Sequence, residues 1–209
     1  MTDAALRADV ADYYSSKLAS HGPTPRGVDW NGAEGQTLRF QQLCRLIDRP
    51  EPFSIADVGC GYGALFDELA ARHEEFRYIG LDISGTMIQA ARARLAHEAR
   101  AQWLCATRPP EPVDYAVASG IFNVRLAYSS AQWESHVEAS LDAMHEVSQH
   151  GFAFNCLTSY SDAEHMRDDL YYADPCRLFD RCKRRYSRQV ALLHDYGLYE
   201  FTIIVRKSP

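Results

Sequence analysis

The feature of this sequence that most constrains its fold is a strand, loop and helix pattern around residue 60. An apolar, β-capable stretch, Phe53–Val58, runs directly into three glycines at alternate positions, Gly59, Gly61 and Gly63. An amphipathic stretch with helical spacing follows at 64–70. Glycine has no Cβ, so such a loop can turn tightly and bring its backbone close to a ligand. The segment therefore predicts a βα unit that holds a ligand at its turn.

Two acidic residues refine this prediction. The residues 78–82 indicate a second strand that ends in Asp82, where dinucleotide-type folds place the acid that binds ribose hydroxyls. Asp57 stands two residues before the first glycine, which gives the pattern D-x-G-x-G-x-G. A carboxylate at that position repels phosphate groups but suits a cationic ligand with an ammonium group.

This pattern resembles motif I and the following acidic position of class I S-adenosylmethionine (SAM)-dependent methyltransferases. The resemblance implies SAM as the cofactor, with the glycines shaping the methionine pocket and Asp82 holding the adenosine ribose. It also implies contacts from residues after the second, third and fourth strands and from the N-terminal segment. The expected cofactor-binding residues are Asp57, Gly59, Cys60, Gly61, Gly63, Asp82, Ile83, Met87, Cys105, Ala106, Ser119, Gly120, Ile121, Tyr14 and Arg39.

Three parts of this prediction have an alternative or differ from the family pattern: Met87, Arg39 and the contacts with the adenine. Met87, on the helix after Asp82, is interpreted either as flanking the adenine or as ordinary helix packing. Arg39 is interpreted either as the partner of the SAM carboxylate or as a solvent-facing helical arginine. The third strand lacks the acid that commonly follows it in the family, so backbone groups or Thr107 are expected to meet the adenine beside Cys105 and Ala106.

Strand and helix patterns alternate along the whole chain. Strands are predicted at 53–58, 77–82, 102–105, 113–118, 151–157, 189–194 and 198–206, and the longer helices at 3–19, 34–48, 130–149 and 174–185. Only residues 195–197 separate the last two strands, which permits only an antiparallel pair. The expected fold is α/β: a seven-stranded, mostly parallel, doubly wound sheet with an antiparallel C-terminal strand, helices on both faces and an N-terminal helical cap. Residues 1–52 form the cap and 53–209 the methyltransferase-like core, within one compact domain.

The acceptor side is predicted from the rule that ligands of such sheets bind outside the carboxyl ends of the strands. The segment 158–174 is longer than the usual connection of about 2–6 residues, and it is interpreted either as a lid or as a surface helix with packing tyrosines. Its rings and its Arg167 would suit an acceptor with an apolar body and an acidic group. The predicted acceptor-binding residues are Trp30, Asn123, Arg125, Asn155, Tyr171 and Tyr172.

Methyl transfer from a sulfonium depends mainly on holding the reacting atoms in line. A hydroxyl or amine acceptor would benefit from a base, and His194 is the candidate because its ordinary pKa lies near 6.5; a structural role is the alternative. Residues 119–123 stand where amino-group methyltransferases carry Asn/Asp-Pro-Pro-Tyr, which disfavours methylation of nucleic-acid bases. The sequence thus predicts methyl transfer to a small molecule, with oxygen as the favoured atom. A SAM-using cyclase or lyase, and a SAM-binding protein without turnover, are the alternatives.

Composition and charge limit the partners, the location and the metal sites that the sequence predicts. The net charge of −6 indicates no general attraction to nucleic acid, and the basic run at 181–188 is interpreted as a solvated helix end. No apolar run approaches the ~18 residues of a membrane span and no signal peptide is visible, so a cytoplasmic location is expected. The six cysteines include no C-x-x-C pair and the eight histidines show no ligand spacing, which predicts reduced thiols and no metal site. The oligomeric state is not predicted.

Overall fold

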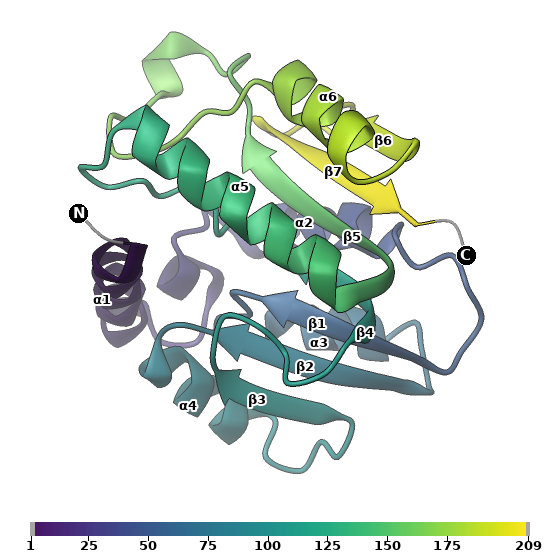
Figure 1. Ribbon diagram of the computed structural model, residues 1–209. Coiled ribbons are helices and arrows are strands. Elements are labelled where there is room, and N and C mark those ends of the chain that lie inside the picture. Colours follow the sequence, from purple (N-terminus) through teal and green to yellow (C-terminus); the bar gives the residue numbers. More distant parts are fainter. Residues whose placement is uncertain (1–2, 208–209) are drawn as a thin grey trace.

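The computed structural model describes residues 3–207, which form one seven-stranded sheet flanked by helices (Figure 1). The strand order is β3-β2-β1-β4-β5-β7-β6. The strands are β1 Phe53–Val58, β2 Phe76–Asp82, β3 Ala101–Cys105, β4 Val113–Ala118, β5 Ser148–Leu157, β6 Gln189–Leu193 and β7 Glu200–Arg206. The helices are α1 Asp3–His21, α2 Ala33–Cys44, α3 Ala64–Ala70, α4 Gly85–Arg94, α5 Ser130–Val147 and α6 Pro175–Arg185, with the short 3₁₀ turns η1 Pro25–Val28 and η2 Ala163–His165.

The pairing of the strands confirms the predicted fold class. β1 pairs in parallel with β2 and β4, β2 with β3, and β4 with β5. β7 runs antiparallel to both β5 and β6. The chain order reverses between β1 and β4, which makes the carboxyl ends of these two strands the topological switch point where such sheets bind ligands.

The helices cover both faces of the sheet, each over its own apolar layer. In Figure 1, α5 and α6 lie in front of the sheet, and α2 and α3 lie behind it. Successive residues of a strand point to opposite faces. On β7, for example, Ile203 and Val205 pack in the layer under α5 and α6, whereas Ile204 packs in the layer with α2 and α3. Both layers are buried, so the sheet is the rigid base on which the strand ends are placed.

The N-terminal segment lies partly at the sheet edge and partly on its face. α1 stands at the carboxyl ends of the central strands in Figure 1, and Ser15 of α1 lies within hydrogen-bond distance of Ser84, 2.9 Å between the two hydroxyl oxygens. α2 packs against α3 and the sheet, where Leu43 is fully buried. The division of the chain at residue 52 and the definition of 158–174 as an insertion stay predictions.

Three elements differ from the prediction in their bounds or in their type of structure. α2 ends at Cys44 instead of 48, because a turn at Arg45 buries Leu46 before the proline-rich stretch. β6 ends at Leu193, so His194 lies outside the strand. Beyond η2, the segment 158–174 contains no helix; it joins its neighbours through isolated bridges, Val124 with Leu170 and Thr158 with Ala173. The surface-helix interpretation of this segment is therefore wrong.

Candidate functional site

Two hollows lie at the carboxyl ends of β1, β2 and β4. The first, which we call the inner cavity, has a volume of about 250 Å³ and is lined from the strand ends, α1, and one face of α5. The second, the outer chamber, has a volume of about 720 Å³ and lies between residues 28–39 and the segment 157–172. Four residues line both hollows: Tyr14, Val28, Trp30 and Gly120. A small recess of about 30 Å³ adjoins the inner cavity beside Asp57.

The glycine loop brings its backbone to the wall of the inner cavity. Gly59 and Gly61 have φ angles of +74° and +55°, which side-chain-bearing residues rarely adopt. A Cβ on Gly59 would lie 2.1 Å from Cγ2 of Ile121, and a Cβ on Gly61 would lie 3.0 Å from Cγ1 of Val28. Glycine at these two positions therefore lets Ile121 and Val28 pack directly against the loop at the wall of the inner cavity.

Asp82 is held rigidly at the end of β2 and lines the inner cavity. One carboxylate oxygen accepts a hydrogen bond from the backbone N–H of Gly61 at 2.9 Å, and the other accepts from Ser84 N–H at 2.8 Å. Burial raises the pKa of Asp82 above its ordinary value, although these backbone donors act in the opposite direction. The carboxylate keeps lone pairs that can accept hydrogen bonds from a ligand's hydroxyl groups.

Asp57 lies beside the small recess and is almost fully buried. Its Oδ2 accepts a hydrogen bond from the Tyr78 hydroxyl at 2.5 Å. Burial raises the pKa of Asp57 to about 7, and the nearby charge of Asp82 acts in the same direction. A cation that entered the recess would favour the charged carboxylate, so the site suits an ammonium group.

Trp30 forms the partition between the two hollows. On one side, a Cβ on Gly120 would lie 2.5 Å from Cζ2 of the indole. Arg39 lies over the indole ring, with its guanidinium carbon 3.8 Å from the ring centroid. Arg39 is itself fixed by a bidentate ion pair with the buried Glu200. Glu200 of β7 thus holds Arg39 in place, and Arg39 in turn packs on the indole ring of Trp30.

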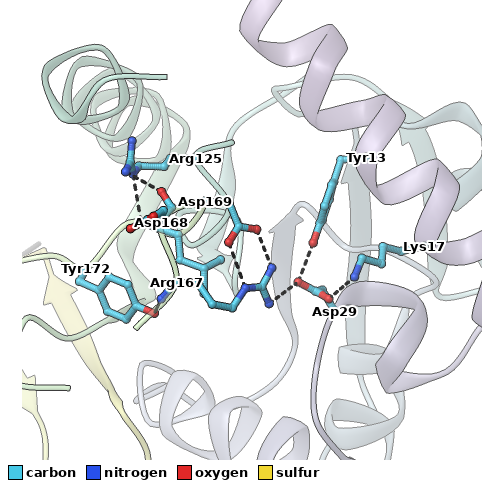
Figure 2. A network of polar contacts seen from close by, with 9 residues as sticks. Tyr13, Lys17, Asp29, Arg125, Arg167, Asp168, Asp169 and Tyr172 are labelled. Atoms are coloured by element: carbon cyan, nitrogen blue, oxygen red, sulfur yellow. Dashed lines mark hydrogen bonds and ion pairs between the residues drawn. The ribbon is translucent and has the colours of Figure 1, made fainter. Parts of the chain in front are cut away.

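The outer chamber is bounded by a polar network that joins the N-terminal segment to residues 167–172 (Figure 2). Asp29 accepts hydrogen bonds from Tyr13 at 2.7 Å and Lys17 at 2.6 Å, and it lies 3.7 Å from Nη1 of Arg167. Arg167 also forms a bidentate pair with Asp169. The network connects α1, the turn after η1 and the segment 158–174 around one chamber.

Most of the predicted cofactor residues line the inner cavity or the recess. Those on the inner cavity are Tyr14, Gly59, Gly61, Asp82, Ile83, Met87, Ala106, Ser119, Gly120 and Ile121, and those that line the recess include Asp57 and Cys60. Gly63 lines neither hollow; it begins α3 with a φ of +80°. The Cys105 thiol is exposed and points to the carbonyl of Ile83. Arg39 faces the outer chamber and is paired with the buried Glu200, and its role as the partner of the cofactor carboxylate stays a prediction.

Three predicted acceptor residues, Trp30, Asn123 and Tyr172, line the outer chamber, and three do not. Arg125 donates to the backbone carbonyls of Leu170, Tyr128 and Asp168, so it anchors the segment. Asn155 is fully buried and accepts a hydrogen bond from Gly120 N–H. The polar groups of Arg125 and Asn155 are thus already hydrogen-bonded within the protein, and their roles in acceptor binding stay predictions.

Tyr171 and His194 also lie outside both hollows. Tyr171 is buried in the apolar layer under α5, and its hydroxyl donates to Glu134 at 3.3 Å. His194 is exposed after the end of β6, packs against the rings of Tyr160 and Phe201, and lines neither hollow. No catalytic role for His194 follows from this position.

The sequence reasoning missed one whole wall of the inner cavity. α5 contributes His136, Ala139, Ser140 and Ala143 to it. These residues recur at the helical spacing of three and four positions, so a stripe of small residues on α5 was the available signal. Asp29, which lines the outer chamber, carried no pattern that could have identified it.

Three further observations concern residues 3–207. No helix in that range combines the length and the apolar character that crossing a membrane requires. No group of three or more histidine, cysteine, aspartate or glutamate side chains lies there in an arrangement that could hold a metal ion. All six cysteines carry free thiols, of which Cys105 and Cys176 are exposed.

Comparison with known proteins identifies the family. Residues 55–151 match the family described as "Methyltransferase domain". A protein of Mycobacterium tuberculosis, named "Putative methyltransferase Rv1506c", is 60% identical over 164 residues, which cover 78% of this chain and 99% of that protein. Trans-aconitate 2-methyltransferase of Afipia carboxidovorans is 36% identical over 108 residues, which cover 46% of this chain and 40% of that enzyme.

Solved structures show the same fold. The DhpI–SAH complex, where SAH is S-adenosylhomocysteine, superposes with a TM-score of 0.66 at 14% identity, over 100% of both chains. The N-methyltransferase NodS from Bradyrhizobium japonicum WM9, in complex with SAH, also gives 0.66, at 17% identity over 95% of this chain and 98% of that one. The chain therefore belongs to the class I SAM-dependent methyltransferases, and SAM is its cofactor.

Proposed function

We propose that this enzyme binds SAM in the inner cavity and recess and methylates a small-molecule acceptor held in the outer chamber. The observation that carries the proposal is the shared wall: Tyr14, Val28, Trp30 and Gly120 line both hollows. A methyl donor on one side of this wall and an acceptor on the other can meet only there. Holding two reactants at such a junction supplies most of what a direct displacement requires.

The residues of the inner cavity fit SAM. Gly59 and Gly61 bring the loop backbone to the cavity wall without a Cβ in the way, and the two buried carboxylates lie at separate places, Asp82 at the inner cavity and Asp57 at the recess. In our proposal Asp57 attracts the ammonium group from the recess, and Asp82 accepts hydrogen bonds from the ribose hydroxyls. When bound, SAM supplies an electrophilic methyl group, which an acceptor oxygen takes as the carbon–sulfur bond breaks and SAH is left.

We favour oxygen as the acceptor atom. The loop after β4 is Ser119–Asn123 in place of the Asn/Asp-Pro-Pro-Tyr sequence of amino-group methyltransferases. A hydroxyl acceptor must lose its proton, and the outer chamber holds several groups that can accept it, among them Asp29, Glu34 and His165. A cytoplasmic location and the lack of nucleic-acid binding belong to the same proposal.

A labelling experiment tests this function. Purified protein is incubated with methyl-labelled SAM and, separately, with a small-metabolite extract, with total RNA and with a protein extract. We expect label in a small molecule only, and none with an Asp82→Ala variant under the same conditions. Label transferred to RNA or protein, with no labelled small molecule, would refute the proposed acceptor class.

Trans-aconitate is a second candidate acceptor. The observation in its favour is the 36% identity to trans-aconitate 2-methyltransferase, which extends over 46% of this chain. Direct assay of trans-aconitate as the sole acceptor, with SAH formation as the readout, decides between this tricarboxylate and other small molecules.

A further inference from the structure

The outer chamber has two guanidinium groups in its wall, and each is already occupied by carboxylates. Arg39 donates to Glu200 through Nε at 2.7 Å and through Nη2 at 2.8 Å. Arg39 has a side-chain exposure of 14% and Glu200 of 2%, so water screens this pair weakly. A ligand carboxylate could reach the fork of Arg39 only by displacing a buried carboxylate of the protein.

Arg167 is also paired with carboxylates, as Figure 2 shows, in a more exposed position, with side-chain exposures of 50% for Arg167 and 39% for Asp169. Its Nε and Nη2 donate to the two oxygens of Asp169 at 3.0 and 2.5 Å. Its remaining terminal nitrogen, Nη1, points to Asp29 at 3.7 Å. Both sides of the guanidinium fork thus face carboxylates, and Lys17 is held by Asp29 as well.

The balance of charge in the chamber is therefore not positive. Among the described residues that line it, the carboxylates are Asp29, Glu34 and Glu200, and the guanidinium groups are Arg39 and Arg167. A carboxylate that leaves water for such a site loses hydration and meets like charges. Specificity through unfavourable contacts with the wrong ligand is a common device of binding sites.

We infer that the outer chamber selects an acceptor without a carboxylate, namely an uncharged molecule that is methylated on a hydroxyl group, and that Asp169 and Glu200 set this selectivity by occupying the two arginines. The inference rests on the proposed function and narrows it. It departs from the acidic acceptor that the sequence suggested, because Arg167 is compensated in the structure. Tyr14 and Asn31, whose side chains carry a hydroxyl and an amide group, also line the chamber and suit a neutral, hydroxylated ligand.

The first test examines the labelled product of the extract experiment. A methyl ester, formed on a carboxylate, releases labelled methanol in mild alkali, whereas a methyl ether, formed on a hydroxyl, does not. We expect the label to be stable in alkali and the product to pass through an anion-exchange resin at neutral pH. Release of labelled methanol, or retention of the product as an anion, would overturn the inference while leaving methyl transfer to a small molecule intact.

The second test asks whether the acid partner of Arg167 excludes carboxylates. Binding of trans-aconitate is measured by calorimetry in saturating SAH for the wild type, Asp169→Asn and Asp168→Asn. Asp168 is the matched control, because it is the neighbouring exposed acid and only its backbone carbonyl takes part in the network. We expect no saturable binding to the wild type or the control.

The Asp169→Asn variant removes the negative charge that faces Nε and Nη2 of Arg167, so it should bind trans-aconitate saturably, with a dissociation constant at least about tenfold below the highest concentration at which the wild type shows no saturation. Saturable binding to the wild type, equal gains in both variants, or no gain in Asp169→Asn would each contradict the inference. SAH affinity is measured first in every protein; if the wild type fails to bind SAH, the proposed function fails instead.

Discussion

Asp82 is the single residue on which cofactor affinity should depend most directly. Its carboxylate is fixed by two backbone N–H groups and lines the inner cavity. Asp82→Asn keeps the shape but removes the charge that strengthens a hydrogen bond from ribose, which should cost about 1.5–3 kcal/mol, or about 10- to 100-fold in the dissociation constant of SAH. Calorimetry measures this. Asp180→Asn, on the exposed face of α6, is the control and should bind as the wild type does.

Gly59 offers a test of the loop geometry with an internal reference. Gly59 and Gly22 both have positive φ angles, +74° and +67°. A Cβ at Gly59 would collide with Ile121, whereas a Cβ at Gly22 would meet nothing within 4 Å. Gly22→Ala should therefore show only the cost of backbone strain, about 1 kcal/mol, in urea unfolding. Gly59→Ala should lose more stability than that and also lose SAH binding; equal losses would show that the collision is relieved at no cost.

The pH dependence of SAM binding should follow the protonation of Asp57. Its pKa is raised from 3.8 to about 7 by burial. If the carboxylate attracts the ammonium group, affinity should fall as pH drops below about 7, by up to about tenfold per pH unit, and level off above it. Asp57→Asn should bind more weakly at neutral pH and lose this dependence. A profile that is unchanged in Asp57→Asn would assign the titration to another group.

The stability of the free protein should depend on Asp57 in the opposite direction. Because its folded-state pKa is raised, the folded state holds the proton more tightly than the unfolded state does. The stability that Asp57 contributes is thus complete below about pH 4 and is lost as pH rises through about 7. Urea unfolding of the wild type and Asp57→Asn across this range measures the difference.

The predicted cofactor residues that line the inner cavity lie mostly at strand ends, where chain order alone decides position. Asp82, Ile83 and Ser119 are examples. The predicted residues that do not line the expected hollow include polar side chains that have a partner elsewhere in the protein. Arg39 pairs with Glu200, 161 residues away, and Asn155 binds the backbone of Gly120, 35 residues away. No local pattern in the sequence reveals that such a group is already satisfied.

At the scale of elements, the Arg39–Glu200 pair ties α2 to the start of β7. Removing one partner of a buried pair leaves an uncompensated charge, so Arg39→Met should cost about 3–5 kcal/mol of unfolding free energy. The double variant Arg39→Met/Glu200→Met should lose less than the single one, because no charge is left behind. Urea unfolding at neutral pH measures both.

The exposed pair Arg184–Asp180 of α6 serves as the reference for this experiment, with side-chain exposures of 77% and 59%. Arg184→Met should change stability by less than about 1 kcal/mol. An Arg39→Met variant as stable as Arg184→Met would mean that water reaches Glu200 and satisfies it.

Elements with strong periodicity were predictable, and connections were not. β1 and β4 have the predicted bounds, 53–58 and 113–118, because apolar runs between turn residues have few alternatives. The segment 158–174 could not be predicted, since its path depends on bridges to Val124 and on the carbonyl contacts of Arg125. Such contacts depend on tertiary structure and produce no periodic pattern in the sequence.

For the whole molecule, cofactor binding should appear as thermal stabilisation. A ligand that binds only the folded state at 100 times its dissociation constant adds about 2.7 kcal/mol. At about 2–4 °C per kcal/mol for a protein of this size, SAH should raise the melting temperature by about 5–11 °C. Differential scanning fluorimetry measures this shift. NAD and ATP serve as controls, and a comparable shift with either would contradict the specificity for SAM.

The two hollows are lined by different parts of the chain. Of the described residues that line the inner cavity, all but Arg7, Val10, Tyr14, Val28 and Trp30 fall within residues 55–151, the segment that matches the family. Of those that line the outer chamber, all but Gly120, Asn123 and Val124 fall outside it. If the inner cavity binds the methyl donor and the outer chamber the acceptor, as proposed, substitutions outside residues 55–151 can change the acceptor while most of the donor site stays the same. Homologues that share only the middle of this sequence should be expected to share its methyl donor and to differ in the molecule they methylate.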